Sequence, residues 1–332
     1  MIKLHYATNL QIMLRYQALG AKTMSDNNYE SVIENNTAFT APVNKSLPGQ
    51  RPEPTILKLY QFGFNIIGRL SPALAGRLAY KLWFTPTRFK TPASERKALD
   101  SAQIEFLRIS DHDIATFSWG QSKLADRPAI LLVHGWSGRG TQLGSFVEPL
   151  LSAGYRVISF DAPAHGKSSG KQTNLYEVAD VILGLQQHYG KFDSVITHSF
   201  GGQCTAVAVQ KGLKTNSIVS ICPPATTFGL VEKFASTLRL TEATKTNMIN
   251  RIETRFDKNI WKNICMQNTV KEISTPGMVI HDAHDTDIPW EEGQAVAYAW
   301  NNAPFKITSG LGHRRILKDK DVIESAISFI TN

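Results

Sequence analysis

The sequence predicts an α/β protein in which helices cover both faces of a mostly parallel, eight-stranded sheet. After about residue 101, short β-rich runs alternate with segments of helical periodicity, the order typical of such a sheet. Two runs, Ala129–Val133 and Arg156–Phe160, are almost continuously apolar, as strands buried on both faces should be. The strands are expected near residues 104–109, 114–119, 129–133, 156–160, 194–197, 217–222, 277–281 and 305–309.

Length and composition are those of a globular protein. The 332 residues are 42% hydrophobic and 19% charged, which excludes wholesale disorder and a small disulfide-stapled scaffold. The three cysteines, Cys204, Cys222 and Cys265, are too scattered for a cysteine metal cage and odd in number, so we expect a reducing compartment. Residues 1–20 show no secretory signal, and no apolar run is long enough to span a membrane. We therefore expect a cytoplasmic protein.

The positive charge is concentrated near the N-terminus. Residues 1–100 hold thirteen Lys and Arg against six Asp and Glu, so they contribute +7 of the net charge of +8. Residues 1–52 are polar and are predicted to be poorly ordered, and a translation start at Met24 remains open. Residues 53–100 predict a basic amphipathic helical extension, with two helices broken near Leu70. Ser71 followed by proline is typical of a helix start.

The basic extension has two interpretations. Cations interleaved with apolar residues over 51–97 are typical of a helix that lies on an anionic membrane surface or packs on a partner. The plainer interpretation, which we favour, is a helical appendage with solvated charges. No nucleic-acid-binding motif accompanies the charge, so we expect no nucleic-acid partner. The sequence does not indicate an oligomeric state.

The remaining chain, residues 101–332, is expected to be one domain that carries a cap. Residues 223–275 are too many for one crossover between strands and predict several amphipathic helices inserted after the sixth strand.

A serine follows the fifth strand directly. Ser199 lies between that strand and a helical segment, with Gly201 two residues later, which matches the second half of the motif G-x-S-x-G. Such a turn directs the hydroxyl toward the helix N-terminus, where the positive end of the dipole favours developing negative charge. Thr197 stands where the first glycine is usual, and a role for Ser199 as a helix N-cap remains open.

Other strand ends supply the remaining groups of an acyl-transfer site. The loop that begins at His134 can offer backbone N–H donors to an oxyanion, and we assign this role to the N–H groups of Trp136 and Phe200. A serine nucleophile needs a base, and the base needs a carboxylate. Asp285 and His313 follow the seventh and eighth strands, at the edge where open parallel sheets gather their ligand groups.

With these motifs the sequence resembles the α/β-hydrolase superfamily over about residues 102–331. The motifs are VHGWSG (133–138), FDAPAHGKS (160–168), THSFGG (197–202), HDAHDTDIP (281–289) and GLGHRRIL (310–317). The resemblance implies the α/β-hydrolase fold. It also implies that Ser199 is the nucleophile, His313 the base and Asp285 its support, in the hydrolysis of an ester, thioester or amide.

Some assignments around these motifs have competitors. The resemblance implies that Asp161 and His165 are scaffold residues, and His134 is expected to be an orienting loop residue. Asp287 is the second candidate for the acid, after Asp285. A Zn²⁺ cluster is the alternative for the acid loop, but we expect no metal because the family loop explains the spacing. That cluster would comprise His281, His284, Asp282, Asp285 and Asp287.

We therefore predict a serine esterase or thioesterase that acts through an acyl-enzyme on a small-molecule substrate with a medium apolar acyl chain, without a cofactor. Two alternatives come from other classes of protein. One is a non-catalytic ligand-binding protein with the same fold, and the other is a membrane-surface lipase or acyltransferase docked through residues 51–97.

Overall fold

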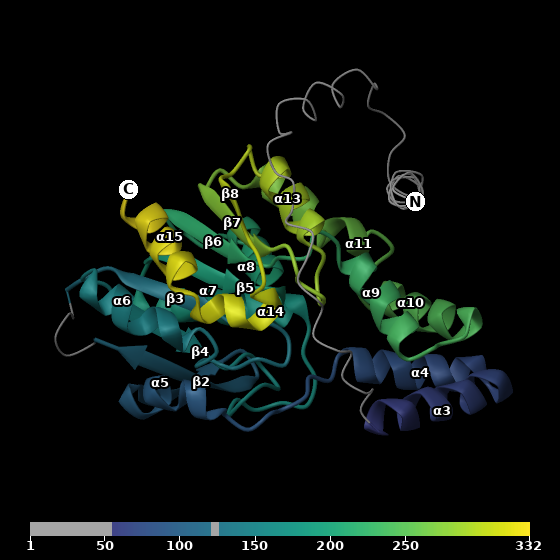
Figure 1. Ribbon diagram of the computed structural model, residues 1–332. Helices are drawn as coiled ribbons and strands as arrows, with labels where there is room; N and C mark the ends of the chain where they lie inside the picture. Colours follow the sequence, from purple (N-terminus) through teal and green to yellow (C-terminus); the bar gives the residue numbers. More distant parts are fainter. Residues whose placement is uncertain (1–54, 121–125) are drawn as a thin grey trace, which may run out of the picture. The chain divides into compact units, whose positions relative to one another are not determined.

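The computed structural model describes residues 55–120 and 126–332 and confirms the predicted α/β fold. The segment 1–52, predicted to be poorly ordered, and the candidate start Met24 lie outside the described residues. Eight strands form one sheet in the order β1-β2-β4-β3-β5-β6-β7-β8 (Figure 1). The strands are β1 (Gln103–Ile109), β2 (His112–Trp119), β3 (Ala129–Val133), β4 (Arg156–Phe160), β5 (Phe192–His198), β6 (Ser217–Ile221), β7 (Gly277–Asp282) and β8 (Phe305–Thr308).

The sheet is parallel from β4 to β8, and β2 is antiparallel to both β1 and β4. All eight predicted strands are present, and their bounds differ from the prediction by at most two residues. At the centre, Leu131 of β3 is level with Ile158 of β4 and Val195 of β5. The parallel strands therefore end at one common edge, where their loops meet.

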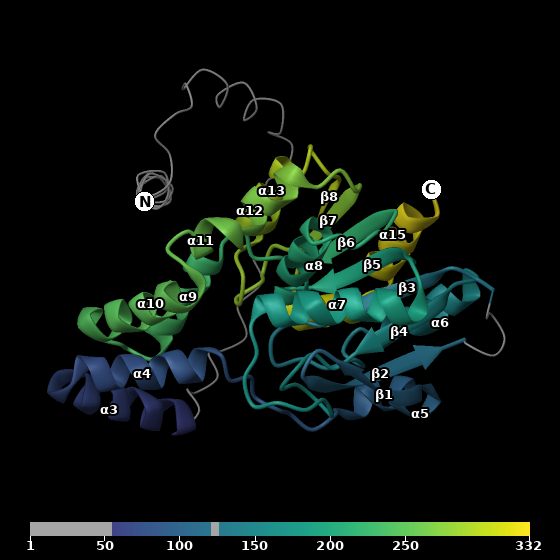
Figure 2. The same cartoon turned by 180° about the vertical axis from the view of Figure 1, so that it is seen from behind.

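Helices cover both faces of the sheet, as the continuous apolar strands require (Figures 1 and 2). In β3, Leu131 and Val133 belong to one hydrophobic core and Ile130 and Leu132 to the other. The first core is covered by α7 (Leu175–Tyr189), α8 (Phe200–Gln210) and α13 (Trp290–Ala299), and the second by α5 (Arg96–Ser101), α6 (Val147–Ser152) and α15 (Lys320–Thr331). Short 3₁₀ helices, η2 (Ala93–Glu95), η3 (Gly144–Phe146), η4 (Val270–Glu272) and η5 (Ile316–Lys318), adjoin α5, α6, α12 (Met266–Thr269) and α14 (Gly312–Arg315).

The long connection between β6 and β7 is helical, as its length predicts. It contains α9 (Thr227–Thr237), α10 (Glu242–Phe256), α11 (Ile260–Asn263) and α12. The first two helices begin at threonines that act as N-caps: Thr226 accepts from the N–H of Gly229, and Thr241 from that of Thr244. Met248 and Ile252 form the buried side of α10.

Two further helices, α3 (Thr55–Leu70) and α4 (Pro72–Trp83), pack on the helices of this connection (Figures 1 and 2). The predicted break lies between them, where the Ser71 side chain accepts from the N–H of Leu74 at 3.3 Å. Gly76 of α4 allows close approach, because a Cβ atom there would lie 2.5 Å from Cβ of Asn247 in α10. Gln61 of α3 adds a hydrogen bond to the carbonyl of Thr237 at 2.9 Å.

The predicted helical extension is interrupted after α4 and is helical again in η2 and α5. Residues 84–92 are irregular, because Pro86 and Pro92 restrict themselves and the residues before them. The favoured interpretation, an appendage with solvated charges, is wrong for Glu95, whereas Arg88 is exposed but also hydrogen-bonded to the protein. Arg88 donates to four carbonyls of the loop from Ala164 to Gly170. Glu95 is buried and accepts from Arg139 and Thr141.

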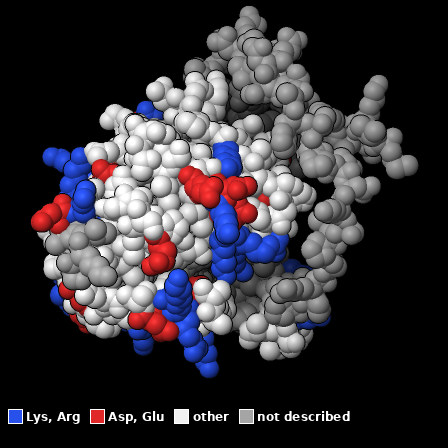
Figure 3. Space-filling model, turned by 60° about the vertical axis from the view of Figure 1, so that its left-hand side comes forward, with Lys and Arg blue, Asp and Glu red and all other residues white. Residues whose placement is uncertain are grey.

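Charge and hydropathy differ between the regions of the described surface. On the face shown in Figure 3, basic and acidic side chains lie beside one another. The helices α3 and α4 instead carry four cations and no acidic residue. No helix among the described residues is long and apolar enough to cross a bilayer.

The packing of α4 on α10 leads to a prediction that compares two glycines. Gly76→Ala is expected to lower the free energy of unfolding by about 1–3 kcal/mol, because its methyl group meets backbone atoms of α10. Gly63→Ala, in the middle of α3 with open space around its Cβ, should raise that free energy by about 0.5–1 kcal/mol. Urea unfolding of both variants checks this, and equal effects would contradict the close α4–α10 contact.

Candidate active site

The strand-to-helix turn after β5 holds Ser199 in a strained conformation. Its φ of 52° and ψ of −122° are rare for a residue with a Cβ atom. The turn is fixed by the N–H of Ser199, which donates to the carbonyl of Ile221 at 2.9 Å. A Cβ on Gly201 would lie 2.7 Å from the carbonyl oxygen of Val133, so glycine is required there. The side chain of Ser199 does not cap α8, so the alternative N-cap role is wrong.

Thr197 fits the place where a glycine is usual. It is fully buried in β5, and its hydroxyl donates to the hydroxyl of Ser220 at 3.1 Å and lies 3.3 Å from the carbonyl of Val219. Gly202 leaves room on the same side, because a Cβ atom there would lie 2.6 Å from Oγ of Ser220. The small residues Ser220 on β6 and Gly202 on α8 therefore make room for threonine in place of glycine, and the turn that carries Ser199 still forms.

Asp285 and His313 are in direct contact. Nδ1 of His313 lies 2.7 Å from Oδ2 of Asp285, whose side chain is fully buried. The other carboxylate oxygen accepts from the N–H groups of Asp287 and Ile288. Burial alone would raise the pKa of Asp285, but the hydrogen bonds from His281 and His313 outweigh it and hold the pKa well below its ordinary value. Asp285 is therefore ionised at neutral pH.

The second candidate for the acid, Asp287, lies elsewhere. Its side chain is 46% exposed, and its carboxylate is 3.7 Å from the guanidinium of Arg314. Of the two aspartates, only Asp285 contacts His313.

Asp282 is a residue whose role the sequence did not reveal. It ends β7 in a fully buried position and accepts from the N–H groups of Leu311 and Gly312, at 3.0 and 2.8 Å. It also accepts from the hydroxyl of Thr308. These bonds fix the loop that immediately precedes His313. The signal was an aspartate where the family pattern has a glycine, next to a strand end.

Two buried histidines contact the loops that carry His313 and Asp285, and these contacts were not predicted from the sequence. His198, directly before Ser199, lies with Nε2 2.8 Å from the carbonyl oxygen of His313, and the two rings are 4.6 Å apart between centroids. This contact places His313 beside the turn of Ser199. Nε2 of His281 lies 3.3 Å from Oδ2 of Asp285 and 3.0 Å from the carbonyl of Ile288.

The loop after β3 lies against Ser199. A Cβ atom on Gly135 would be 3.2 Å from Cβ of Ser199. Among the described residues, no hydrogen-bond acceptor is recorded for the backbone N–H of Trp136 or of Phe200. The Trp136 and Phe200 rings pack edge to face at 5.2 Å. The two residues that make this ring contact, one from each segment, thus have backbone N–H groups with no acceptor recorded in the described part of the chain.

His134 and His165 hold this loop as neutral rings, as expected for scaffold residues. Nε2 of His134 accepts from the N–H of Ala162, so Nδ1 carries the proton and donates to the carbonyl of Gly135. Nε2 of His165 accepts from the N–H of Ser137 in the same way. Burial lowers the pKa of His134 to about 4 and that of His165 to about 3.

Asp161, also predicted to be a scaffold residue, ties two loop segments together. Its buried carboxylate accepts from the N–H groups of Gly140 and Lys167, at 2.7 and 2.6 Å.

The alternative zinc cluster of the acid loop does not assemble as five convergent ligands. Asp282 accepts backbone donors, Asp287 faces Arg314, and His284 is exposed and accepts from the N–H of Gly310. Cys222, Asp285 and His313 do lie with one ligand atom each within 4.8 Å of one another. However, burial and the neighbouring Asp285 raise the pKa of the Cys222 thiol well above its ordinary value, so it is protonated.

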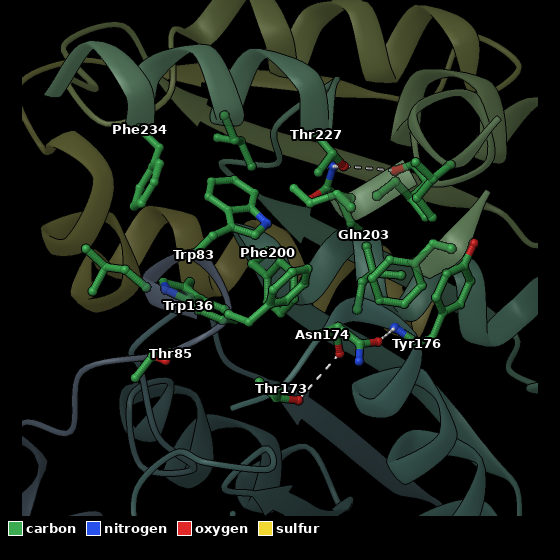
Figure 4. A pocket seen from close by; sticks show the side chains of 18 of the residues that line it. Trp83, Thr85, Trp136, Thr173, Asn174, Tyr176, Phe200, Gln203, Thr227 and Phe234 are labelled. Atoms are coloured by element: carbon green, nitrogen blue, oxygen red, sulfur yellow. Dashed lines mark hydrogen bonds between the residues drawn. The ribbon is translucent and has the colours of Figure 1, made fainter. Parts of the chain in front are cut away.

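A pocket of about 450 Å³ is lined by Ser199 and by residues of the helices after β6, and Figure 4 shows part of its lining. The described residues that line it include no charged side chain. Most are apolar or aromatic: Leu82, Trp83, Phe84, Trp136, Leu175, Tyr176, Phe200, Leu230, Phe234, Leu238, Ile252, Phe256, Ile260, Trp261 and Ile264. The polar exceptions that Figure 4 labels are Thr85, Thr173, Asn174, Gln203 and Thr227.

The fold and these strand-end loops define an α/β protein with a serine, a histidine and an aspartate at one edge of its sheet. Residues 130–324, more than half of the chain, match the family model described as the alpha/beta hydrolase family. The chain therefore belongs to the alpha/beta hydrolase family.

Curated relatives match over shorter stretches. The chain is 40% identical over 95 residues to the magnesium-chelatase 30 kDa subunit of Rhodobacter capsulatus, and the match covers 27% of this chain and 32% of that protein. It is 35% identical over 89 residues to a serine hydrolase-like protein of Danio rerio, which covers 25% and 26%. The chain thus aligns with less than two thirds of the length of either relative.

Among solved structures, a membrane phospholipase A described as a bacterial virulence factor has the same fold. Its TM-score is 0.55 at 15% identity, and the match covers 83% of this chain and 97% of that chain.

The two neutral histidines predict a loss of stability in acid. Each has a folded-state pKa below its unfolded value, so the unfolded chain binds protons first and the free energy of unfolding falls as the pH drops below about 6.5. Between about pH 7.5 and pH 5, each is expected to cost about 2 kcal/mol. Urea unfolding at the two pH values measures the loss. Imidazole NMR signals of His134 that titrate near the ordinary histidine pKa would contradict the assignment.

Proposed function

We propose that the protein is a serine hydrolase that cleaves an ester or thioester through an acyl-enzyme. The observation that carries this proposal is the 2.7 Å contact between Asp285 and His313 beside the strained turn of Ser199, at the wall of an uncharged pocket. Family membership supports hydrolysis in general, and the chemistry of these residues supports the narrower class.

In the first half of the reaction, Oγ of Ser199 attacks the acyl carbonyl carbon while Nε2 of His313 takes the hydroxyl proton. Asp285 accepts from Nδ1–H of His313, which fixes the tautomer and stabilises the imidazolium. The carbonyl oxygen becomes an oxyanion, which the free N–H groups of Trp136 and Phe200 stabilise. His313 then gives its proton to the leaving alcohol or thiol, and the acyl group stays on Ser199.

In the second half, His313 takes a proton from water as the water oxygen attacks the acyl-enzyme. The C–O bond to Ser199 breaks, the proton returns to Oγ, and the carboxylic acid leaves. The same donors stabilise the second oxyanion, so one geometry serves both halves of the reaction.

The pocket favours an apolar, uncharged acyl group. A charged group would lose its hydration in a cavity whose described lining offers no counter-ion, which is costly. Aromatic and aliphatic side chains instead reward burial of an alkyl or aryl chain in proportion to the area removed from water. We therefore propose a small-molecule ester or thioester with an apolar acyl chain of medium length, with no cofactor and no metal.

The assignment of Ser199 as the nucleophile can be tested directly. A fluorophosphonate probe is expected to label Ser199, and peptide mass mapping locates the adduct. Ser199→Ala should abolish the label and reduce turnover of a short-chain ester by at least about 10⁴-fold. His313→Ala should slow labelling sharply, because the base is lost. A well-folded protein that the probe does not label would contradict the proposal and favour the non-catalytic ligand-binding alternative.

The assignment of Asp285 as the acid can be tested by comparing variants of Asp285 and Asp287. Asp285→Asn is expected to reduce kcat by about 10³–10⁴-fold, because the amide no longer stabilises the His313 imidazolium. Asp287→Asn removes the same charge two residues later and should change kcat by less than about twofold, because its carboxylate is partly exposed and 3.7 Å from its partner. Equal losses in the two variants would show that the acid is not Asp285 alone.

A further inference from the structure

We propose that the outer face of α3 and α4 docks on an anionic lipid bilayer and that acyl chains enter the pocket from there. Docking itself does not depend on the chemistry at Ser199. Only the statement that lipid acyl esters are the substrates rests on the proposed function.

The first observation is a cluster of exposed apolar side chains, here called the outer face. Eight of the thirteen large hydrophobic side chains exposed among the described residues lie on these two neighbouring helices. Their exposed fractions reach 67% at Phe62 and 81% at Leu70. The outer face comprises Ile56, Leu59, Tyr60, Phe62, Ile66 and Leu70 of α3 with Leu74 and Leu78 of α4.

The face belongs to one side of α3. Ile56, Leu59, Tyr60, Ile66 and Leu70 follow each other at helical spacing, so they lie on one stripe. The opposite stripe is already used, because Gln61, Phe64 and Gly68 are buried toward α4 and the helices after β6. A contiguous exposed apolar patch that lies outside the packed side of the helix marks an interaction site.

The second observation is charge. The charged residues of α3 and α4 are Lys58, Arg69, Arg77 and Lys81, all exposed and all positive. None takes part in the ion pairs recorded among the described residues. A surface that is both apolar and cationic, without acidic residues, complements an interface that offers acyl chains below a layer of phosphates.

The third observation is continuity with the pocket. Leu82 and Trp83 at the end of α4, and Phe84 after it, line the cavity that contains Ser199. Trp83 packs edge to face on Phe234 of α9, with ring centroids 5.2 Å apart. Figure 4 shows both side chains at the cavity wall. Helix α4, which carries Leu74 and Leu78 of the outer face, therefore also builds part of the wall of the pocket.

The structure also limits which part of the basic segment can dock. Arg88 donates to the carbonyls of the loop 164–170, and Glu95 attaches the following segment to Arg139 in the loop after β3. Within the described residues, docking is therefore assigned to α3 and α4, rather than to the whole of residues 51–97.

Flotation of the full chain with vesicles tests docking, with Ser199→Ala used to prevent hydrolysis. Binding is expected to vesicles of phosphatidylcholine with phosphatidylglycerol, to weaken with salt, and to be weaker on phosphatidylcholine alone. Lys58→Gln and Arg69→Gln should each lower the partition coefficient on anionic vesicles by about fivefold. Phe62→Ser should lower it by about tenfold on both kinds of vesicle.

A matched control comes from the edge strand β1. Phe106 on this strand is 60% exposed, close to the 67% of Phe62, so Phe106→Ser removes the same, similarly exposed side chain outside the outer face. It is expected to leave vesicle binding unchanged. Failure of the full chain to bind anionic vesicles, or equal losses from Phe62→Ser and Phe106→Ser, would overturn the proposal. A Phe62-dependent dimer without vesicle binding would also overturn it and assign the face to a second copy of the chain.

Turnover separates this proposal from the proposed function. In the catalytically intact chain, Phe62→Ser should keep its turnover of a soluble short-chain ester and lose about tenfold on a long-chain ester presented in anionic vesicles. If Phe62→Ser kept full turnover of both esters, the result would contradict docking but agree with the proposed function. Vesicle binding without turnover of any ester would contradict the proposed function and leave docking supported.

Discussion

Two buried carboxylates at the end of β7 set the geometry of the candidate site. A carboxylate without water must be satisfied by protein donors, since an unpaired buried charge is strongly destabilising. Asp282 takes its donors from residues 308, 311 and 312, and Asp285 takes its donors from His281, His313 and the backbone at 287 and 288. The loops that follow β7 and β8 are thus held to each other through these two side chains. The position of His313 is a consequence of that requirement.

The turn that carries Ser199 depends on a different constraint, the close approach of backbones. Gly201 lies against the end of β3, and Gly202 against Ser220 of β6, each at a distance that a Cβ atom would violate. This packing holds Ser199 at a positive φ that would otherwise be unfavourable. The loop after β3 is fixed by neutral histidines, and burial lowers the pKa of each so that it stays neutral well below neutral pH. At this edge of the sheet, hydrogen bonds to buried polar groups position His313, and close backbone contacts position Ser199. Both kinds of interaction are needed to bring the two residues to one place.

Local sequence patterns predicted the sheet well, because strands buried on both faces leave continuous apolar runs such as Ala129–Val133. The order of motifs at strand ends also pointed to Ser199, Asp285 and His313. The roles of Asp282 and His198 could not be predicted, because each acts on a loop 30 to 115 residues away in the chain. The same holds for Arg88, whose charge looked solvated in the sequence and is held by four carbonyls about 80 residues later. Hydropathy patterns predict which faces of an element are buried, but they do not predict hydrogen-bond partners that are distant in the sequence.

The packed side of helix α3 is a further feature that sequence periodicity did not predict. Its sequence has more large apolar side chains than its packed side can bury, so the pattern alone cannot decide which of them face the protein. The structure resolves this, because Gly68 and Gly76 permit close contact with α10 on one side and leave the larger side chains on the other. Small residues thus select the packed face, and the large residues remain outside. Helix α4 carries part of the outer face and also ends in the wall of the pocket. The proposed docking would therefore take place next to the cavity that contains Ser199, where Trp83 of α4 packs edge to face on Phe234 of α9.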